Sequence, residues 1–558
     1  MEHFEGIETY SVKHLPIVKT YADRLGLVEL INHLVPSEMD LSPGVYFLGM
    51  VLDTLSGRNP LYRLEHFFED QDTELLLGKE VGAKSFNDVN VGRFLDKVFD
   101  IGAVKIFKEI SMRAVSKFGL DCRHVHFDTT SRSVYGDYEP YGNDPFEITY
   151  GHSKDHRPDL KQFLISMLCV DRNVPVFGKI EDGNASDKSV NNDVLSEISK
   201  YMAAHGLGTG AFIYIADSAA ITKKNLKAIG KDILFISRLP ATFKECDRAI
   251  KEAVQKDVWE DVGVIAKTKP TAKRPAAYYK SYETEVTLYG ETYRAVVIHS
   301  SAHDRRRQKR IERNLLEEKK TLTGKCNEVA KLDYFCREDA EAAANKLSEE
   351  PCLYYEINTQ VEEKPIYGKG RPRKDGFQKI KEMRYVVSAD IVEDVVAVST
   401  FREEAGCFVL ISNVPKESEG EQIEYDSKAI LEAYKDQYGI EQDFGFLKDP
   451  VIVNSVFLKK PKRIEVLGLI LLTSLLIWRL MERSMRQYVA QTGEKLPGWD
   501  RKPTDRPTSF MMTTKFTGIM VIKIDNERRL SKPLHSDQEA FLMALGINPS
   551  WLIKPQSG

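Results

Sequence analysis

The sequence predicts an α/β protein built on a mixed sheet, and the order of apolar segments between residues 123 and 240 carries this prediction. Three strand-like segments come first, "RHVHFDTTSRSV", "QFLISMLCV" and "PVFGKIEDGN", and the turn "DRNVP" joins the last two like a hairpin. A helical segment, the buried strand "AFIYIADS", the short helix "KKNLKAIG" and the strand "ILFISRLP" follow. Antiparallel strands followed by strand, helix and strand make a mixed sheet.

The chain has 558 residues, too many for one hydrophobic core, so we expect several domains. The start of the chain reads as helical, paired strands recur in "SYETEVTLYGETYRAVVIHS", and "GCFVLISN" reads as a returning core strand. We expect a helical N-terminal domain at 1–120, the first part of an α/β core at 121–240, a β-rich basic insertion at 241–405, the second part of the core at 406–490, and a C-terminal region at 491–558.

Composition describes an ordinary globular protein, with 42% hydrophobic and 29% charged residues. The formal net charge of −4 argues against a general polyanion binder, so any nucleic-acid contact must come from a local basic patch. The seven cysteines form no CxxC pair, and the start of the chain is polar rather than signal-like. These features predict a reduced, cytoplasmic setting.

The longest apolar run, "VLGLILLTSLLIW" at 466–478, is too short to span a bilayer and lies beside charged residues. We expect a buried core helix there and no membrane partner.

Two aspartates follow or end predicted core strands. Asp128 follows "HVHF" and precedes three hydroxyl residues, and Asp217 ends "FIYIA". Ligands gather at the carboxyl ends of strands in such sheets, so the two carboxylates are candidates for one site. The alternative for each is a capping role at a turn or helix start.

A third carboxylate, Glu441, lies in "SKAILEAYKDQYGIEQDFGFLKD", which the sequence predicts to begin one long helix. On such a helix Tyr434, Glu441 and Lys448 lie near one line, with Tyr438 and Phe444 flanking Glu441 at a buried margin. Burial of a carboxylate there requires a compensating cation. Lys448 is two turns away, about 10 Å along the axis, so metal ligation is the better account. An all-oxygen carboxylate set suits Mg²⁺.

The spacing of Tyr434, Gln437, Glu441 and Lys448 resembles the Y-R-E-K signature of the IS4-type transposase group, with Gln437 where that pattern has Arg. The blocks "FDTTSRSVYGDY", "YGHSKDHRPDLKQF", "GNASD", "IADSAA" and "PTSFMMTTKFTGI", with "HLPIVKTYADRLGL" and "NDVNVGRFLDKVFD" near the start, resemble the IS1634 branch of that group. The resemblance spans nearly the whole chain.

This resemblance implies an RNase H-like catalytic core interrupted by a β-rich insertion, with Asp128, Asp217 and Glu441 as the catalytic and metal-binding triad. The implied cofactor is Mg²⁺, two ions per active site, with Mn²⁺ as a substitute. Tyr434 and Lys448 match the signature and are expected at DNA, where Lys448 would hold a phosphate. Gln437 is a weaker DNA contact, because it can donate a hydrogen bond but carries no charge.

The expected insertion is locally basic, with 14 basic and 7 acidic residues between 267 and 320. "RRRQKR" suggests phosphate contacts by Arg305, Arg306 and Arg307, against the alternative of a solvated helix face. "KGRPRK", with Lys369, Arg371 and Arg373, resembles an AT-hook that enters A·T-rich minor grooves, or is a plain basic loop.

Four other residues have structural interpretations that we prefer. His152, Asp155 and Asp159 could suggest a metal site, but turn or supporting roles are favoured. Trp259 is a packing residue rather than a base-stacking one.

Together these features predict a cut-and-paste DNA transposase that acts on the inverted-repeat ends of its own insertion sequence. Its partners would be terminal-repeat and target DNA and a second protomer in the synaptic complex, in a prokaryotic cytoplasm at the nucleoid. The rivals are an immobile nuclease derived from a transposase and a non-catalytic DNA-binding protein whose three carboxylates are structural.

Overall fold

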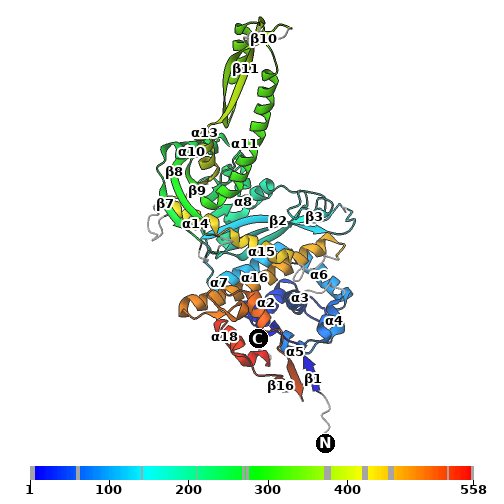
Figure 1. Cartoon of the computed structure of the whole chain (residues 1–558). Helices are drawn as coiled ribbons and strands as arrows, with labels where there is room; N and C mark the ends of the chain where they lie inside the picture. Colours follow the sequence, from blue (N-terminus) through cyan, green and yellow to red (C-terminus); the bar gives the residue numbers. More distant parts are fainter. Residues whose placement is uncertain are drawn as a thin grey trace. The chain divides into compact units, whose positions relative to one another are not determined.

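The chain forms two compact units in a computed structural model (Figure 1). The core unit joins Met1–Ser237 to Ala433–Gly558, and the inserted unit is Arg238–Glu432. The structure describes residues 7–57, 63–139, 142–208, 210–266, 270–271, 275–369, 379–416, 425–449, 458–524 and 527–554, without the side chains of 303–308 and 501.

The first part of the core unit is helical, as the sequence predicts. Each longer helix packs a stripe of buried residues inward. Gly26 has the left-handed conformation, with φ 61°, at the point where α1 ends and α2 begins. The helices are α1 (Leu15–Leu25), α2 (Leu27–Leu34), α3 (Pro43–Gly57), α4 (Leu64–Glu69), α5 (Thr73–Leu77), η2 (Ala83–Phe86), α6 (Asp88–Ile101) and α7 (Ala103–Phe118).

The apolar run at 466–478 lies in α16 (Pro461–Thr492), which is the central helix of the core unit. In its most apolar 18-residue window, of mean hydropathy 2.0, 94% is buried inside the protein, although length and composition alone would fit a membrane span. It packs against α1, α3, α6 and α7 and against the sheet strand β4 (Val174–Glu181). The expectation of a buried core helix is therefore confirmed.

A small antiparallel sheet of order β1-β15-β16 joins the first strand of the chain to two strands of its C-terminal region (Figure 1). Arg528 on β16 donates to Asp72 and Glu74 beside α5, and both Arg528 and Asp72 are buried. The elements are β1 (Ile7–Tyr10), β13 (Leu496–Pro497), η4 (Trp499–Arg501), β14 (Pro503–Thr504), α17 (Ser509–Lys515), β15 (Val521–Ile524), β16 (Glu527–Leu530), α18 (Ser536–Ala544) and η5 (Pro549–Leu552).

The sheet of the core unit has the order β4-β3-β2-β5-β6, which is the mixed sheet that the sequence predicts. β2, β3 and β4 pair antiparallel, whereas β2, β5 and β6 pair parallel. The elements are β2 (His124–Val134), β3 (Lys161–Val170), β4, α8 (Asp187–Ala204), β5 (Ile213–Ala216), η3 (Ser218–Ala220), α9 (Lys223–Ile229) and β6 (Leu234–Arg238). Helices cover it because its strands are apolar on both sides: β3 has nine buried residues in ten.

The inserted unit contains a strand group of order β12-β9-β8-β7 and a separate two-stranded ribbon, β10-β11. Helix α11 lies along this ribbon (Figure 1), and a small core of buried side chains, including Leu315, Leu322 and Tyr355, joins them. The elements are α10 (Lys244–Lys256), β7 (Glu260–Val264), β8 (Tyr278–Leu288), β9 (Glu291–Ser300), α11 (Ser301–Ala330), α12 (Arg337–Ser348), β10 (Tyr355–Tyr367), β11 (Ile380–Glu393), α13 (Val395–Ala405) and β12 (Cys407–Ser412).

The long helix expected from residue 427 is wrong. Two helices form instead, α14 (Ser427–Lys435) and α15 (Tyr438–Lys448), with a turn at Asp436 and Gln437 between them. The second helix begins close to another backbone segment: a side chain at Gly439 would come within 2.4 Å of the carbonyl oxygen of Arg172. Only glycine lets the helix start this close to that neighbouring backbone.

Candidate active site

Asp128 and Asp217 occupy adjacent positions on neighbouring parallel strands. β2 pairs with β5 in register up to His126 and Ile215. Asp128 is two residues beyond that pair on β2, and Asp217 is two residues beyond it on the other strand, directly after β5 ends. Adjacent strands are about 4.8 Å apart, so the structure brings these two predicted residues together at the carboxyl end of β5.

The two carboxyl groups are half-buried, and their surroundings disfavour charge. Burial raises the pKa of Asp128 to about 7, the ammonium of Lys154 opposes that rise, and the charges of Asp217 and Asp187 add to it. Burial is also the main cause that raises the pKa of Asp217. The backbone N–H of Ala219 donates to Asp217 Oδ1 at 3.0 Å, so Asp217 does cap the short helix η3. Capping uses one oxygen and leaves the other for a ligand.

Two further residues complete this group, and the sequence did not single them out. Lys154 Nζ lies 3.2 Å from Asp187 Oδ1 and 3.9 Å from Asp128 Oδ1. It also donates to the backbone oxygen and to the hydroxyl of Thr129, both at 2.7 Å. Asp187 is the first residue of α8 and accepts a hydrogen bond from the same hydroxyl. Two aspartates therefore pair with one ammonium group, whose charge also opposes the rise in the pKa of Asp217.

The loops that carry Lys154 and Asp187 are held together by close backbone contact. A side chain at Gly151 would come within 2.1 Å of the oxygen of Gly183, so both loops need glycine where they meet. Gln162 donates to that same oxygen at 2.7 Å and to the oxygen of His152 at 3.3 Å. The blocks "YGHSKDH" and "GNASD" thus form one structure, but their contact exists only in the folded chain, so the sequence carries no local signal for Lys154 and Asp187.

Helix α15 runs beside β2. Near its start the side chain of Gln437 donates to the oxygen of Phe127 at 3.4 Å. At its end the oxygen of Lys448 accepts from Arg132 at 3.3 Å. Glu441 lies one turn after Gln437, on the part of α15 that runs beside β2, the strand that contains Asp128.

Glu441 itself is exposed, and the expectation of a half-buried carboxylate between two rings is wrong. Tyr438 is 58% exposed and does not cover it. The helix instead turns Ile440, Asp443 and Leu447 inward. Burial of Glu441 therefore does not argue for a metal, and its candidacy rests on its place on α15 and on the sequence signature.

The other signature residues are distributed along the same two helices. Tyr434 lies on α14, before the break, so it does not share a helix face with Glu441. Lys448 forms an ion pair with Asp155 in the loop that also holds Lys154. Asp155 therefore has the supporting role that the sequence favours. Asp159 is exposed and pairs with Arg157 at 2.7 Å.

The expected DNA contacts of the inserted unit fall largely on residues that are not described. The side chains of Arg305, Arg306 and Arg307 belong to α11 but lie outside the described part, and Arg371 and Arg373 lie outside it altogether. Lys369 is exposed and lies two residues after the end of β10. Trp259 packs its ring 6.0 Å from His299 and 6.5 Å from Tyr282, in agreement with a packing role.

The donors at Asp128 and Asp217 fit a hard divalent cation in their chemistry, because all are carboxylate oxygens and their mutual repulsion is relieved by positive charge. Within the described ranges no three His, Cys, Asp or Glu side chains already converge as a metal-binding group. Glu441 would have to turn toward the pair to complete one.

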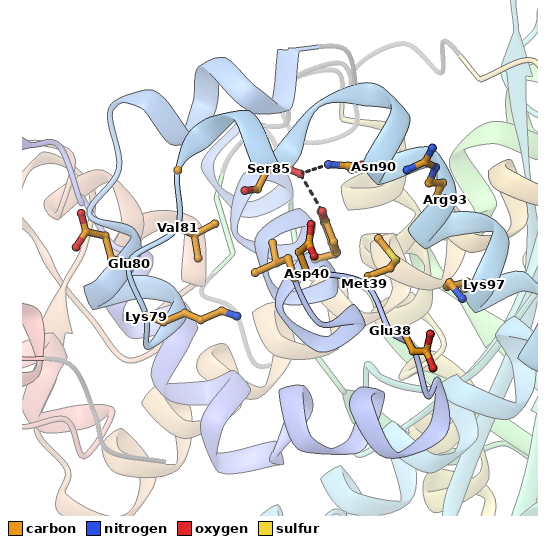
Figure 2. A pocket seen from close by; sticks show the side chains of 13 residues that line it. Glu38, Met39, Asp40, Lys79, Glu80, Val81, Ser85, Asn90, Arg93 and Lys97 are labelled. Atoms are coloured by element: carbon orange, nitrogen blue, oxygen red, sulfur yellow. Dashed lines mark hydrogen bonds between the residues drawn. The ribbon is translucent and has the colours of Figure 1, made fainter.

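A separate cavity of about 580 Å³ lies among the N-terminal helices, between the α2–α3 linker, the α5–η2 linker and α6 (Figure 2). Its wall carries both positive and negative side chains. The backbone oxygen of Ser85 accepts hydrogen bonds from the Tyr46 hydroxyl at 2.9 Å and from the Asn90 side chain at 3.3 Å, which links α3, η2 and α6. The charged side chains of the lining are Glu38, Asp40, Lys79, Glu80, Arg93 and Lys97.

Residues 7–112 match a family described as a domain of unknown function (DUF4277). The chain is similar to a piggyBac transposase solved by cryo-electron microscopy in a synaptic complex with hairpin DNA, at 9% identity and a TM-score of 0.36, over 96% of this chain and 80% of that one. No curated protein matches the chain.

Proposed function

We propose that this protein is a DNA transposase of the IS4 type, in its IS1634-like branch, with an RNase H-like core. It would cut the inverted-repeat ends of its own insertion sequence and join them to target DNA. The observation that carries the proposal is the adjacency of Asp128, within β2, and Asp217, directly after the parallel strand β5, with the helix of Glu441 beside β2. The signature spacing around Glu441 adds the substrate class.

In the proposed mechanism Asp128, Asp217 and Glu441 hold Mg²⁺. Bound there, two divalent cations would lower the pKa of an attacking water or 3′-hydroxyl and neutralise the leaving oxygen of the scissile phosphate. The half-buried position of the aspartates favours this use, because electrostatic interactions are stronger where water is excluded. The same site would serve cleavage and joining, since only the nucleophile differs between them.

The remaining residues would bind and orient DNA. Lys448 would offer a phosphate a fixed positive charge, with Asp155 holding the ammonium in place. Gln437 is already bonded to the backbone of Phe127, so its proposed role is to position α15 rather than to grip DNA. The basic segments of the inserted unit would follow the DNA backbone, and the protein would act at the nucleoid.

The direct test is cleavage of the DNA that flanks the reading frame, with and without Mg²⁺. Wild type should cut at the element ends only with the metal, and Asp128→Ala, Asp217→Ala and Glu441→Ala should each lose at least a thousandfold in rate while keeping DNA binding. Asp193→Ala, an exposed carboxylate on α8, is the matched control and should cut normally.

Each alternative has a distinct result in the same assay. Binding without any cleavage, unaffected by the three substitutions, would identify a non-catalytic DNA-binding protein. Metal-dependent cleavage without joining would identify an immobile nuclease. Full activity in any one triad variant would refute the assignment of that residue.

A further inference from the structure

Lys154 is the one cation that the described structure places among the aspartates of the candidate site, and its position is fixed from several sides. Its backbone N–H donates to Ser131 on β2 at 2.9 Å, and its ammonium donates to both oxygens of Thr129. The side chain is 28% exposed. A lysine with a flexible stem is held this firmly only by several bonds at once, so its location is a property of the fold.

The ammonium is shared unequally between two carboxylates. Asp187 Oδ1 is 3.2 Å away and Asp128 Oδ1 is 3.9 Å away. Asp187 accepts in addition from Thr129, which links the ammonium, the hydroxyl and the carboxylate in one ring of contacts. The ammonium is thus held mainly by Asp187 and lies within ion-pair distance of Asp128.

We propose that Lys154 is a positioning residue of the site: its ammonium, anchored by Asp187 and Thr129, is the resident counter-ion of Asp128 and thereby sets how tightly the site holds a divalent cation. The inference rests on the proposed function. A fixed positive charge near a site repels an incoming divalent cation. Without the ammonium of Lys154 the aspartates would attract the divalent cation more strongly. They would also repel one another whenever the divalent cation is absent. Lys154 therefore lowers the affinity of the site for the metal and keeps the aspartates in place when no metal is bound.

The effect has a sign that a merely structural role cannot reproduce. Lys154→Met keeps most of the stem but removes the charge, so Mn²⁺ should bind at least tenfold more tightly. Asp187→Asn removes the anchor and leaves the ammonium free to pair with Asp128, so Mn²⁺ should bind several-fold more weakly. Loss of structure would weaken binding in both variants.

The measurement is Mn²⁺ titration of the full chain without DNA, by calorimetry and by the electron paramagnetic resonance signal of free Mn²⁺. Lys188→Met is the control, since Lys188 is exposed and next to Asp187 but has no place in the ring of contacts. It should leave Mn²⁺ affinity within about twofold of wild type. Lys154→Arg keeps the charge and should remain near wild type.

Asp217→Ala separates this inference from the proposed function. If it abolishes Mn²⁺ binding but Lys154→Met binds as wild type does, the role of Lys154 is refuted and the metal site stands. If Asp217→Ala leaves Mn²⁺ binding unchanged, the metal site itself is refuted, and the role of Lys154 with it. Weaker binding in Lys154→Met also overturns the inference.

Discussion

Arg479 Nε donates to Asp443 Oδ1 at 2.5 Å in the interior of the core unit, where the Asp443 side chain is fully buried and that of Arg479 is 7% exposed. This bond ties α15 to α16. Cys169 Sγ donates to the other oxygen of Asp443 at 3.3 Å, and Glu482 pairs with Arg479 from the far side. Burial raises the pKa of Asp443 to about 7 against the opposing charge of Arg479.

Asp443→Ala should therefore destabilise the core unit by about 3 kcal/mol or more, because it leaves Arg479 buried with one partner fewer. Thermal melting and hydrogen exchange of α15 are the measurements, and the loss should appear first in α15. Asp443→Leu combined with Arg479→Met should recover much of the loss, since it removes both charges. As the control, Asp159→Asn breaks an exposed pair and should have little effect on stability, because solvent screens that interaction. Equal effects in the two would contradict the interpretation.

The sheet shows how much the sequence could predict. Apolar runs and the "DRNVP" turn are local signals, so β2, β3, β4, β5 and β6 were all expected, as was the mixed order. The register that sets Asp128 beside Asp217 was not available, because the pairing of two residues separated by 89 positions (217 − 128) leaves no local pattern.

The site shows what the sequence could not predict. Helical spacing continued from Tyr434 to Lys448, but the folded chain turns at Asp436 and Gln437 and divides this stretch into two helices. Glu441 is exposed because α15 turns Ile440, Asp443 and Leu447 inward instead. Lys154 and Asp187 were overlooked because a charged residue in a polar loop has no periodicity, and only the folded backbone brings the two loops together.

The stability of the core unit should depend on pH through His14. This ring is buried, its Nε2 is 2.9 Å from the oxygen of Leu55, and burial lowers its pKa to about 4 from 6.5. Between pH 6.5 and pH 4 the unfolded chain therefore binds more protons than the folded chain does. The contribution of neutral His14 to the unfolding free energy is complete above pH 6.5 and is lost as the pH falls toward 4.

His14→Gln lacks this titration, so the difference in unfolding free energy between the two proteins should change with pH. Relative to His14→Gln, wild type should lose about 2 kcal/mol between pH 8 and pH 5. Denaturant unfolding at the two pH values measures it. A constant difference would mean that the folded His14 binds its proton normally.

DNA binding should depend on the basic start of α11. Replacing Arg305, Arg306, Arg307 and Lys309 by Gln should weaken binding to all DNA sequences and reduce the slope of log affinity against log salt by about 3, since each phosphate contact releases a counterion. Lys319→Gln with Lys320→Gln on the same helix is the control for total charge. An unchanged slope in the fourfold variant would mark a solvated helix face.

The Arg-Pro loop should act differently from this helix. Arg371→Ala should weaken binding to A·T-rich DNA selectively, because a minor-groove contact depends on groove width whereas a backbone contact does not. Competition between A·T-rich and G·C-rich duplexes measures the selectivity. Equal weakening on both would leave Lys369, Arg371 and Arg373 as a plain basic loop.

Assembly on DNA should involve two protomers. One site cuts one element end, and the two ends must move together, so a synaptic complex requires at least two copies of the chain. The inserted unit offers exposed apolar surface for this contact: Leu353, Val395 and Val396 are 63%, 71% and 77% exposed, and the backbone bond from Asp394 to Tyr354 holds their segments together. We expect a two-fold dimer on terminal-repeat DNA, in which each protomer cuts the end bound chiefly by the other.

Light scattering with and without repeat DNA tests the stoichiometry, and Val396→Asp should weaken the dimer without changing the fold of the free chain. Mixing Asp217→Ala protein with a variant neutralised at the start of α11 tests the exchange of ends. The first protein binds DNA without cutting and the second retains its triad, so a mixed dimer should regain cleavage at one end only if sites act across the pair. A complex with one protomer per pair of ends would refute the dimer. Mixed dimers that never regain cleavage would refute only the claim that each protomer cuts the end bound by the other. Each site would then act on the end that its own chain binds.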